Sequence, residues 1–145
     1  MDKERIGVAI VSDKDRVDLR ERLQAEIEKN PRLIVVLLSR VKTSRIGQEI
    51  KKKNPDMVFI TASLYTPEEV DELQGFVRRL RKHLPQTNIV IHTPQLSTTQ
   101  REVFFEAGAN CWINHAEPYE ILGGALEKLA TGKEIVHLSI IKKGT

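Results

Sequence analysis

Five polar residues that could carry chemistry stand at the ends of short apolar runs. In chain order they are Ser12, Asp13, Thr61, Thr93 and His115. A carboxylate can hold a hard divalent cation, a hydroxyl can become a nucleophile when a base activates it, and an imidazole titrates near neutral pH. Four of them, Ser12, Thr61, Thr93 and His115, could together form a small pocket for an anion or another ligand; the alternative is a set of polar positions that hold no ligand.

The elements that would position these residues alternate along the chain. The apolar runs are short and apolar on both faces, which is typical of buried strands, and amphipathic segments separate them. The expected strands are 6–11, 33–38, 57–61, 88–92 and 111–114, and the expected helices are 15–29, 44–53, 66–84, 97–107 and 118–131. This alternation predicts an α/β fold: a doubly wound, five-stranded parallel sheet with five helices. The carboxyl ends of such strands meet at one edge, which would gather the polar residues.

Length and composition restrict the class of protein. The 145 residues fit one domain, and 40% hydrophobic with 30% charged residues is typical of a soluble globular protein. The longest aliphatic run, 33–38, is far shorter than the roughly 20 residues of a membrane helix. The charged start, 1–5, is unlike a signal peptide, so we expect a cytoplasmic protein without a membrane segment.

Net charge and cysteine count narrow the possible partners. The net charge of +3 permits nucleic-acid binding but does not indicate it, so we expect no nucleic-acid partner for this domain alone. The single cysteine, Cys111, excludes an intramolecular disulfide and a CxxC metal site. The basic runs 51–53 and 78–83 are expected to be solvated helix faces; a docking patch for an acidic partner or nucleic acid is the alternative.

Two segments resemble the receiver domains of bacterial two-component response regulators, the CheY-like family. Residues 55–60 resemble the approach to the family's phosphoacceptor strand, and residues 108–113 resemble the Gly-Ala turn before its fifth strand. The resemblance runs from about residue 5 to residue 132 and implies the strand order 2-1-3-4-5. It also implies a receiver-like domain over residues 1–132.

The chain departs from this family at the positions that carry its chemistry. By resemblance, Thr61 replaces the phosphorylated aspartate, Ser12 replaces one of two acids while Asp13 keeps the other, and His115 replaces a lysine; Thr93 keeps the family's hydroxyl. Receiver phosphorylation needs a carboxylate nucleophile and carboxylate-held Mg²⁺. With one carboxylate left and no evident base for Thr61, we expect weak or absent Mg²⁺ binding, no cofactor and no enzyme activity.

The resemblance also implies an interaction surface and a reporter residue. The surface would be formed by the fourth helix, the fifth strand and the fifth helix, residues 97–131. Trp112 matches the aromatic residue that reports activation in the family; the alternative is a packing residue on an edge strand. Phe104 and Phe105 are adjacent on a helix, so at least one is expected to be partly exposed, which suits an interface. We therefore expect a pseudo-receiver that signals, independently of phosphorylation, through a protein partner or a homodimer.

Residues 133–145 form a C-terminal extension beyond the receiver-like part. Its apolar stretch, 135–141, could add a strand at the sheet edge, make a dimer contact or link to an output domain. Two other functions remain as alternatives. The chain could be a regulatory module of a longer transcription regulator or pilus-assembly ATPase. It could also be a flavodoxin-like protein that binds a nucleotide or another small ligand, although it has neither GxGxxG nor a P-loop.

Overall fold

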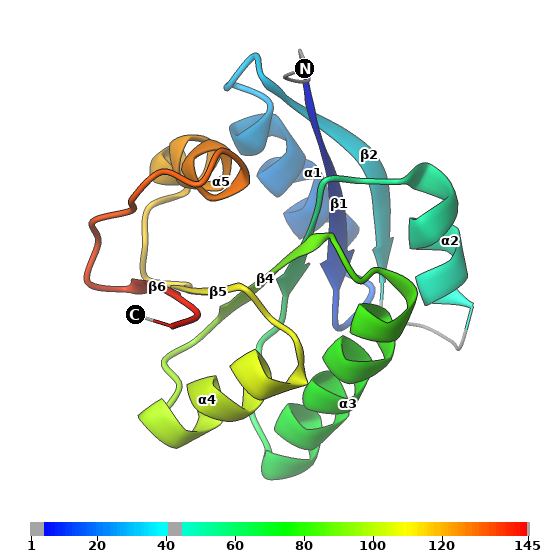
Figure 1. Cartoon of the computed structure of the whole chain (residues 1–145), viewed down its shortest axis with the longest axis vertical. Helices are drawn as coiled ribbons and strands as arrows, with labels where there is room; N and C mark the ends of the chain where they lie inside the picture. The colour runs from blue at the N-terminus through cyan, green and yellow to red at the C-terminus, as the bar shows by residue number, and fades with distance from the viewer. Residues whose placement is uncertain (1–4, 41–44, 145) are drawn as a thin grey trace.

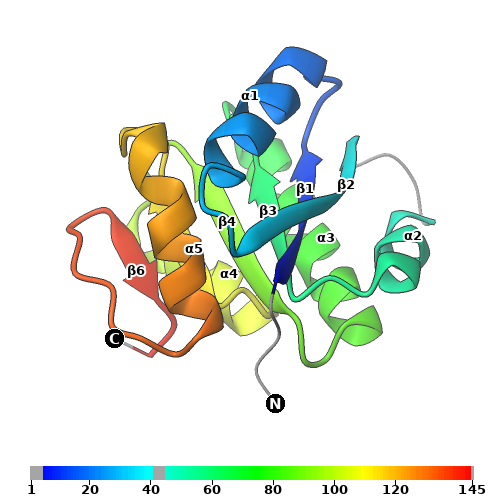
Figure 2. The same ribbon diagram turned by 90° about the horizontal axis from the view of Figure 1, so that it is seen from above.

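A single sheet with helices on both faces forms the molecule (Figures 1 and 2). The computed structural model describes residues 5–40 and 45–144. The strands are β1 (Ile6–Ser12), β2 (Leu33–Arg40), β3 (Met57–Thr61), β4 (Asn88–Thr93), β5 (Cys111–Asn114) and β6 (Ile140–Lys142). The helices are α1 (Val17–Ile27), α2 (Ile46–Lys53), α3 (Pro67–His83), α4 (Thr98–Ala107) and α5 (Leu122–Ala130), with a 3₁₀ turn, η1 (Tyr119–Ile121), before α5. Over the described ranges, none of these helices has the length and apolarity of a membrane span.

The α/β class and the order of the first five strands are confirmed, whereas the number of strands is not. The observed order is β2-β1-β3-β4-β5-β6, and β1 to β5 are parallel. The sixth strand pairs antiparallel with β5, and it comes from the C-terminal extension, for which an added strand was one alternative. Ile140 packs on one face of the sheet and Ile141 on the other, so this short strand buries apolar surface on both sides.

Several helices are shorter than the sequence pattern predicts. The first begins at Val17 rather than at residue 15, and the expected helix 118–131 is divided into the 3₁₀ turn and α5. Ser44, the expected first residue of the second helix, lies outside the described residues. The long helix α3 starts as predicted, because Thr66 accepts a hydrogen bond from the backbone N–H of Glu69 at 3.2 Å.

The two faces of the sheet carry separate hydrophobic layers. Figure 2 shows α1 and α5 on one face, and α2, α3 and α4 on the other. Phe59 of β3 packs with α1 and α5, while its neighbours Val58 and Ile60 pack with the other three helices. This alternation follows from the two-residue period of a strand. It places Thr61, two residues beyond Phe59, on the α1 and α5 face.

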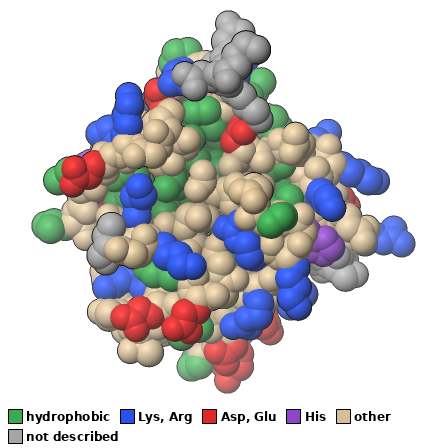
Figure 3. Space-filling view, viewed as in Figure 1, with side chains coloured by type: hydrophobic (Ala, Val, Ile, Leu, Met, Phe, Trp, Pro, Cys, Tyr) green, Lys and Arg blue, Asp and Glu red, His purple; other side chains and the backbone are tan. Residues whose placement is uncertain are grey.

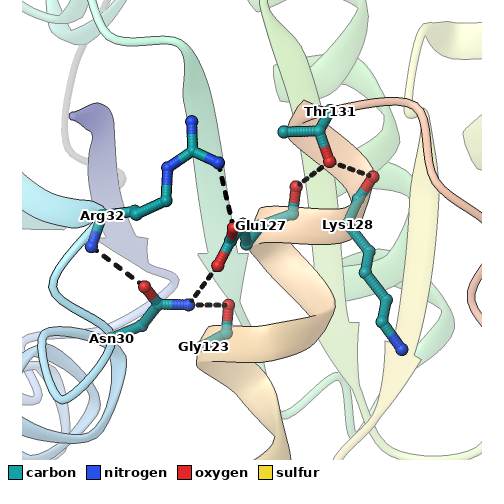
Figure 4. Close-up of polar contacts among 6 residues, drawn as sticks. All are labelled: Asn30, Arg32, Gly123, Glu127, Lys128 and Thr131. Carbon is teal, nitrogen blue, oxygen red and sulfur yellow. Dashed lines mark hydrogen bonds and ion pairs between the residues drawn. The ribbon is translucent and has the colours of Figure 1, made fainter. Parts of the chain in front are cut away.

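A polar cluster ties α5 to the turn before β2 (Figure 4). The side chain of Asn30 donates to the carbonyl of Gly123 at 3.3 Å and to the carboxylate of Glu127 at 2.8 Å. Arg32 donates to the other oxygen of Glu127 at 3.1 Å. The hydrogen bond from Asn30, and then the contact with Arg32, hold the pKa of Glu127 below its ordinary value. The cluster therefore fixes α5 against the β1 and β2 side of the sheet.

A second polar cluster joins α3 to the start of β5. The guanidinium of Arg81 donates to the carbonyls of Gly108, Leu84 and Thr87, and to the side-chain oxygen of Asn110. Gly108 has a φ of 131°, and a Cβ there would lie 2.8 Å from the Arg81 side chain. Gly108 is thus required both for its backbone conformation and for the close approach of Arg81.

Candidate functional site

The carboxyl ends of the central strands bring Thr61 and two histidines together. The Thr61 hydroxyl oxygen lies 3.0 Å from Nδ1 of His92 and 3.4 Å from Nε2 of His115. The two imidazole rings are 4.3 Å apart between centroids. Thr61 and His115 were both expected at this edge, because parallel strands end there. His92 was not expected to take part.

His92 is a buried neutral imidazole. It is 1% exposed, its ring lies against those of Phe59 and Tyr119, and its Nε2 has no hydrogen-bond partner among the described residues. Burial, and to a smaller extent the nearby His115, lower the pKa of His92 to about 3. The signal in the sequence was a single histidine inside the apolar run 88–92, which the strand pattern does not distinguish from a core residue.

The hydrogen bonds also fix where His115 carries its proton. Nε2 of His115 lies 2.9 Å from the backbone carbonyl of His92, and a carbonyl oxygen can only accept. Nε2 of His115 is therefore protonated. Burial lowers the pKa of His115, and Arg16 lowers it too, while the hydrogen bond to the His92 carbonyl and the charge of Asp13 oppose this shift.

The expectation that no base lies near Thr61 is wrong, but the base that is present is weak. Nδ1 of His92 is within hydrogen-bond distance of the Thr61 hydroxyl. An imidazole whose pKa is about 3 cannot take a proton efficiently from an alcohol, because general-base catalysis works best when the pKa is near the working pH. Thr61 is also only 1% exposed. The pair is therefore arranged as a buried hydrogen bond and not as an activated nucleophile.

Two arginines at the beginning of α1 reach the same strand ends. Arg20 is buried and donates from Nη1 to the Ser12 hydroxyl at 2.8 Å, and Arg16 donates to the Ser63 hydroxyl at 2.8 Å. Sequence reasoning missed both, although their spacing of four residues is the spacing that places two side chains on one helix face. Ser12, which by resemblance stands in place of an acid, thus accepts a hydrogen bond from a guanidinium.

These surroundings do not fit the magnesium ion that the receiver fold implies. Asp13 keeps one carboxylate, whose Oδ2 accepts a hydrogen bond from the backbone N–H of Ser63 at 3.1 Å. Ser12 and Thr61 provide only neutral hydroxyls, and the guanidinium of Arg20 brings a positive charge to Ser12. Within residues 5–40 and 45–144, no group of three or more His, Cys, Asp or Glu side chains is placed to hold a metal. Mg²⁺ prefers several oxygen ligands, often carboxylates, so the site lacks a suitable donor set.

Thr93 does not join the cluster around Thr61, because it points to the opposite face of the sheet from His92. Its hydroxyl donates to the carbonyl of Pro94 at 2.8 Å and accepts from Nε1 of Trp112 at 2.9 Å. Trp112 is 2% exposed, and the guanidinium of Arg101 lies 5.1 Å from its ring centroid. The interpretation of Trp112 as an edge-strand residue is wrong, since β6 pairs along the outer side of β5.

The two phenylalanines of α4 have different surroundings. Phe104 is 1% exposed and belongs to the core, so it is not available at a surface. Phe105 is partly buried and lines a groove of about 400 Å³ between α4 and β6. Ile141 and Lys143 line the same groove. The expected surface of α4, β5 and α5 therefore carries β6 at the place where the edge of β5 would otherwise be exposed.

Comparisons with known proteins support the fold. No family model matches the sequence, and no curated protein matches it. A LuxR-family two-component response regulator from Aurantimonas sp. SI85-9A1 is 21% identical, with a TM-score of 0.72, and the match covers 91% of this chain and 89% of that one. RcsB of Salmonella typhimurium is 14% identical with a TM-score of 0.73; the match covers 94% of this chain but only 65% of RcsB. A pilus assembly-related protein from Burkholderia pseudomallei K96243 is 14% identical with a TM-score of 0.66, over 93% and 96% of the two chains. The chain has the receiver fold.

Proposed function

We propose that this chain is a pseudo-receiver: a signalling module that works without phosphorylation and acts by binding a protein partner or a second copy of itself. The observation that carries the proposal is the state of Thr61. By resemblance, its hydroxyl takes the place of the family's phosphoacceptor carboxylate. The side chain is almost fully buried, and the neighbouring base, His92, has a pKa of about 3. The residue needed for phosphotransfer is replaced by a structural hydrogen bond.

The arginine at Ser12 gives independent support. In a working receiver, Mg²⁺ neutralises the incoming phosphoryl oxygens, and acidic side chains hold that ion. Here Arg20 occupies the hydrogen-bonding position at Ser12, and it also contacts Asp15 at 3.3 Å. A positive charge at this place opposes the binding of a divalent cation. We infer that neither phosphorylation nor a divalent cation changes the charge at the strand ends, and that the protein signals through contacts made by its surface.

The surface proposed for these contacts is the face of α4, β5 and α5, as modified by β6. Phe105 and Ile141 provide partly exposed apolar area there, and Arg101, Glu102 and Lys143 surround it with charges of both signs. An apolar centre with a charged rim is the usual organisation of a protein interface. A protein partner or a homodimer fits this face, and we do not assign an enzyme activity.

The absence of phosphorylation can be tested directly. The protein is incubated with acetyl phosphate and Mg²⁺, and its intact mass is measured beside a phosphorylatable receiver domain that controls for the reagents. We expect no added phosphoryl group on this chain. A hydroxylamine-labile adduct would overturn the proposal, and so would a stable phosphoester on Thr61.

The proposed surface is tested by one substitution with a matched control. Phe105→Arg places a charge in the groove beside β6, and Gln48→Arg adds the same charge to an exposed position on α2. If the protein is a homodimer, size-exclusion chromatography with light scattering should show a monomer for F105R and a dimer for Q48R. A dimer that survives F105R would place the interface elsewhere. If the wild type is a monomer, the same two variants are compared for the amount of protein partner that each captures.

A longer protein is the second candidate context for the same module. The observation that favours it is the coverage of RcsB, of which the chain spans 65%. RcsB is described as a response regulator studied for DNA interaction. In that arrangement the described residues would regulate another domain rather than act alone. Expressing the module with and without its neighbouring coding sequence, and comparing the output, would distinguish the two contexts.

A further inference from the structure

A groove with an apolar floor lies between α2 and α3, far from the site at the strand ends. Its volume is about 220 Å³. Ile46, Phe76 and Leu80 form the floor, and Arg79, Lys82 and His83 form much of the rim. The His83 ring packs so closely on α2 that a Cβ on Gly47 would lie 2.9 Å from it. The two helices thus leave a shaped depression and not a flat contact.

Unpaired positive charges lie on the two helices that form this groove, and Arg79 and Lys82 line it directly. The last turn of α2 contributes Lys51, Lys52 and Lys53, all exposed, and the end of α3 contributes Arg78, Arg79 and Lys82, also exposed. None of these six residues forms an ion pair with a carboxylate among the described residues. Basic residues in a last helical turn also interact favourably with the helix dipole. The dipole accounts for their position on each helix, but not for the apolar groove that Arg79 and Lys82 border.

The charges on α3 are separated along its length. Its beginning carries the exposed acidic residues Glu68, Asp71 and Glu72, whereas its end is basic. In Figure 3, Lys and Arg side chains surround a histidine over α2 and the end of α3, and acidic side chains gather lower on the same face. The basic side chains of α3 are therefore confined to its C-terminal half.

We propose that this groove is a second docking site, which binds an acidic polypeptide segment through one apolar side chain. The apolar side chain would enter the groove between Ile46 and Phe76, and the flanking carboxylates would meet the basic rim. The chemistry is complementary in both parts, because burial supplies affinity at the centre and the charges supply orientation and association rate at the edge.

The charge pattern favours a short acidic peptide over a nucleic acid. A nucleic-acid strand is an extended row of phosphates and needs a long basic track. A strand laid along α3 would leave the basic end and meet the carboxylates of Glu68, Asp71 and Glu72. The apolar floor of the groove would also offer nothing that binds a phosphate group. A compact acidic segment satisfies the rim and the floor together.

The test measures binding of defined probes by fluorescence anisotropy at low and moderate salt. One labelled probe is a short peptide of glutamate and aspartate with a central leucine, and a second has serine in place of that leucine. An oligothymidylate of equal charge is the nucleic-acid probe. We expect the leucine peptide to bind most tightly and its affinity to fall with added salt.

Two charge-reversal variants locate the binding site. Lys51→Glu with Arg79→Glu reverses one charge on α2, one helical turn beyond Gly47, and one charge on the rim of the groove. Lys128→Glu with Lys133→Glu makes the same change in charge on and after α5. The first pair of substitutions should lower the affinity for the leucine peptide by about tenfold or more, because two attractive charges become repulsive. The second pair should leave its affinity within about twofold, since these lysines lie on the other face of the sheet. If the first pair does not fold, K51Q with R79Q replaces it.

Four results would overturn the proposal: no binding of the leucine peptide, equal binding of the serine peptide, tighter binding of the oligothymidylate, or an unchanged affinity in K51E/R79E. The outcome is independent of the surface proposed above. F105R should bind the leucine peptide as the wild type does, so failure of the α4 surface and failure of this groove can be told apart.

Discussion

Nε1 of Trp112 donates a hydrogen bond to the hydroxyl of Thr93 at 2.9 Å, and this bond joins β5 to β4 inside the core. By resemblance, both residues occupy positions that move when a receiver is activated. Here the Thr93 hydroxyl also donates to the carbonyl of Pro94, so it is engaged both as an acceptor and as a donor. Strand β6 lies on the other side of Trp112 and holds it in place.

Removing the Thr93 hydroxyl should destabilise the protein. Thr93→Val keeps the shape of the side chain but leaves the buried indole N–H without a partner, which costs about 1–3 kcal/mol. Thr93→Ser keeps the hydroxyl and is the control. Trp112 is the only tryptophan, so urea unfolding followed by its fluorescence measures the effect. Equal stability of T93V and the wild type would show that the hydrogen bond has no structural role.

Acid should destabilise the fold through His92. Its folded pKa of about 3 is lower than the unfolded value of 6.5, so the unfolded chain binds the proton first. The stabilising contribution is complete above pH 6.5 and is lost as the pH falls toward 3. The lowered pKa of His115 acts in the same direction. His92→Gln removes the ionisation while keeping a polar partner for Thr61.

The measurement is the free energy of unfolding in urea at several values of pH. Between pH 7 and pH 4, the wild type should lose on the order of 3 kcal/mol more than H92Q. Gln48→Ala, an exposed substitution on the other face of the sheet that removes no ionisable group, should follow the wild-type curve. Parallel curves for H92Q and the wild type would contradict the assignment of His92 as a buried neutral imidazole.

Arg81 should be intolerant of a conservative change. A lysine cannot reach the carbonyls of Gly108, Leu84 and Thr87 together with Asn110, because its ammonium is a single point. Arg81→Lys should therefore lower the free energy of unfolding by about 2–4 kcal/mol. The same substitution at the exposed Arg79 should change it by less than about 0.5 kcal/mol. If both variants unfold alike in urea, the Arg81 cluster does not stabilise the fold.

Strand β6 should contribute to stability through Ile140. Ile140 is 4% exposed, and Ile140→Ala should cost about 2–4 kcal/mol. Leu138, two residues earlier, is 100% exposed, so Leu138→Ala is a control that should stay within about 0.5 kcal/mol of the wild type. Thermal unfolding of the two variants provides the comparison. An unaffected I140A would mean that β6 is not firmly attached to β5.

The sequence was sufficient to predict the main part of the fold, because the spacing of its apolar residues identifies the strands and helices and their order along the chain indicates the topology. Apolar runs such as 57–61 are buried strands, and Thr66 with Pro67 marks the start of α3. Strand β6 could only be listed among alternatives, since three residues are too few to show a period. The beginning of α5 was misplaced because 119–121 form a 3₁₀ turn, whose residues are compatible with an α-helix.

The site could be predicted only in part, for a related reason. Strand order brings Thr61 and His115 to one edge, which the pattern implied. It does not say which neighbouring side chains fill the space between them. His92 was hidden in an apolar run, Arg16 and Arg20 belonged to a helix with many charges, and Thr93 was grouped with the others although its side chain faces away from His92.

The position of Arg20 at Ser12 has a consequence for how such a module could be controlled. A guanidinium keeps its charge throughout the physiological range, so the positive charge beside Ser12 does not change with the pH of the cell. Under the proposed function, the protein cannot store a signal as a covalent mark at this site. The signal would instead depend on how much of the protein is present and on how much of it is bound to a partner. Cells would adjust that signal by synthesis, degradation or competition among partners.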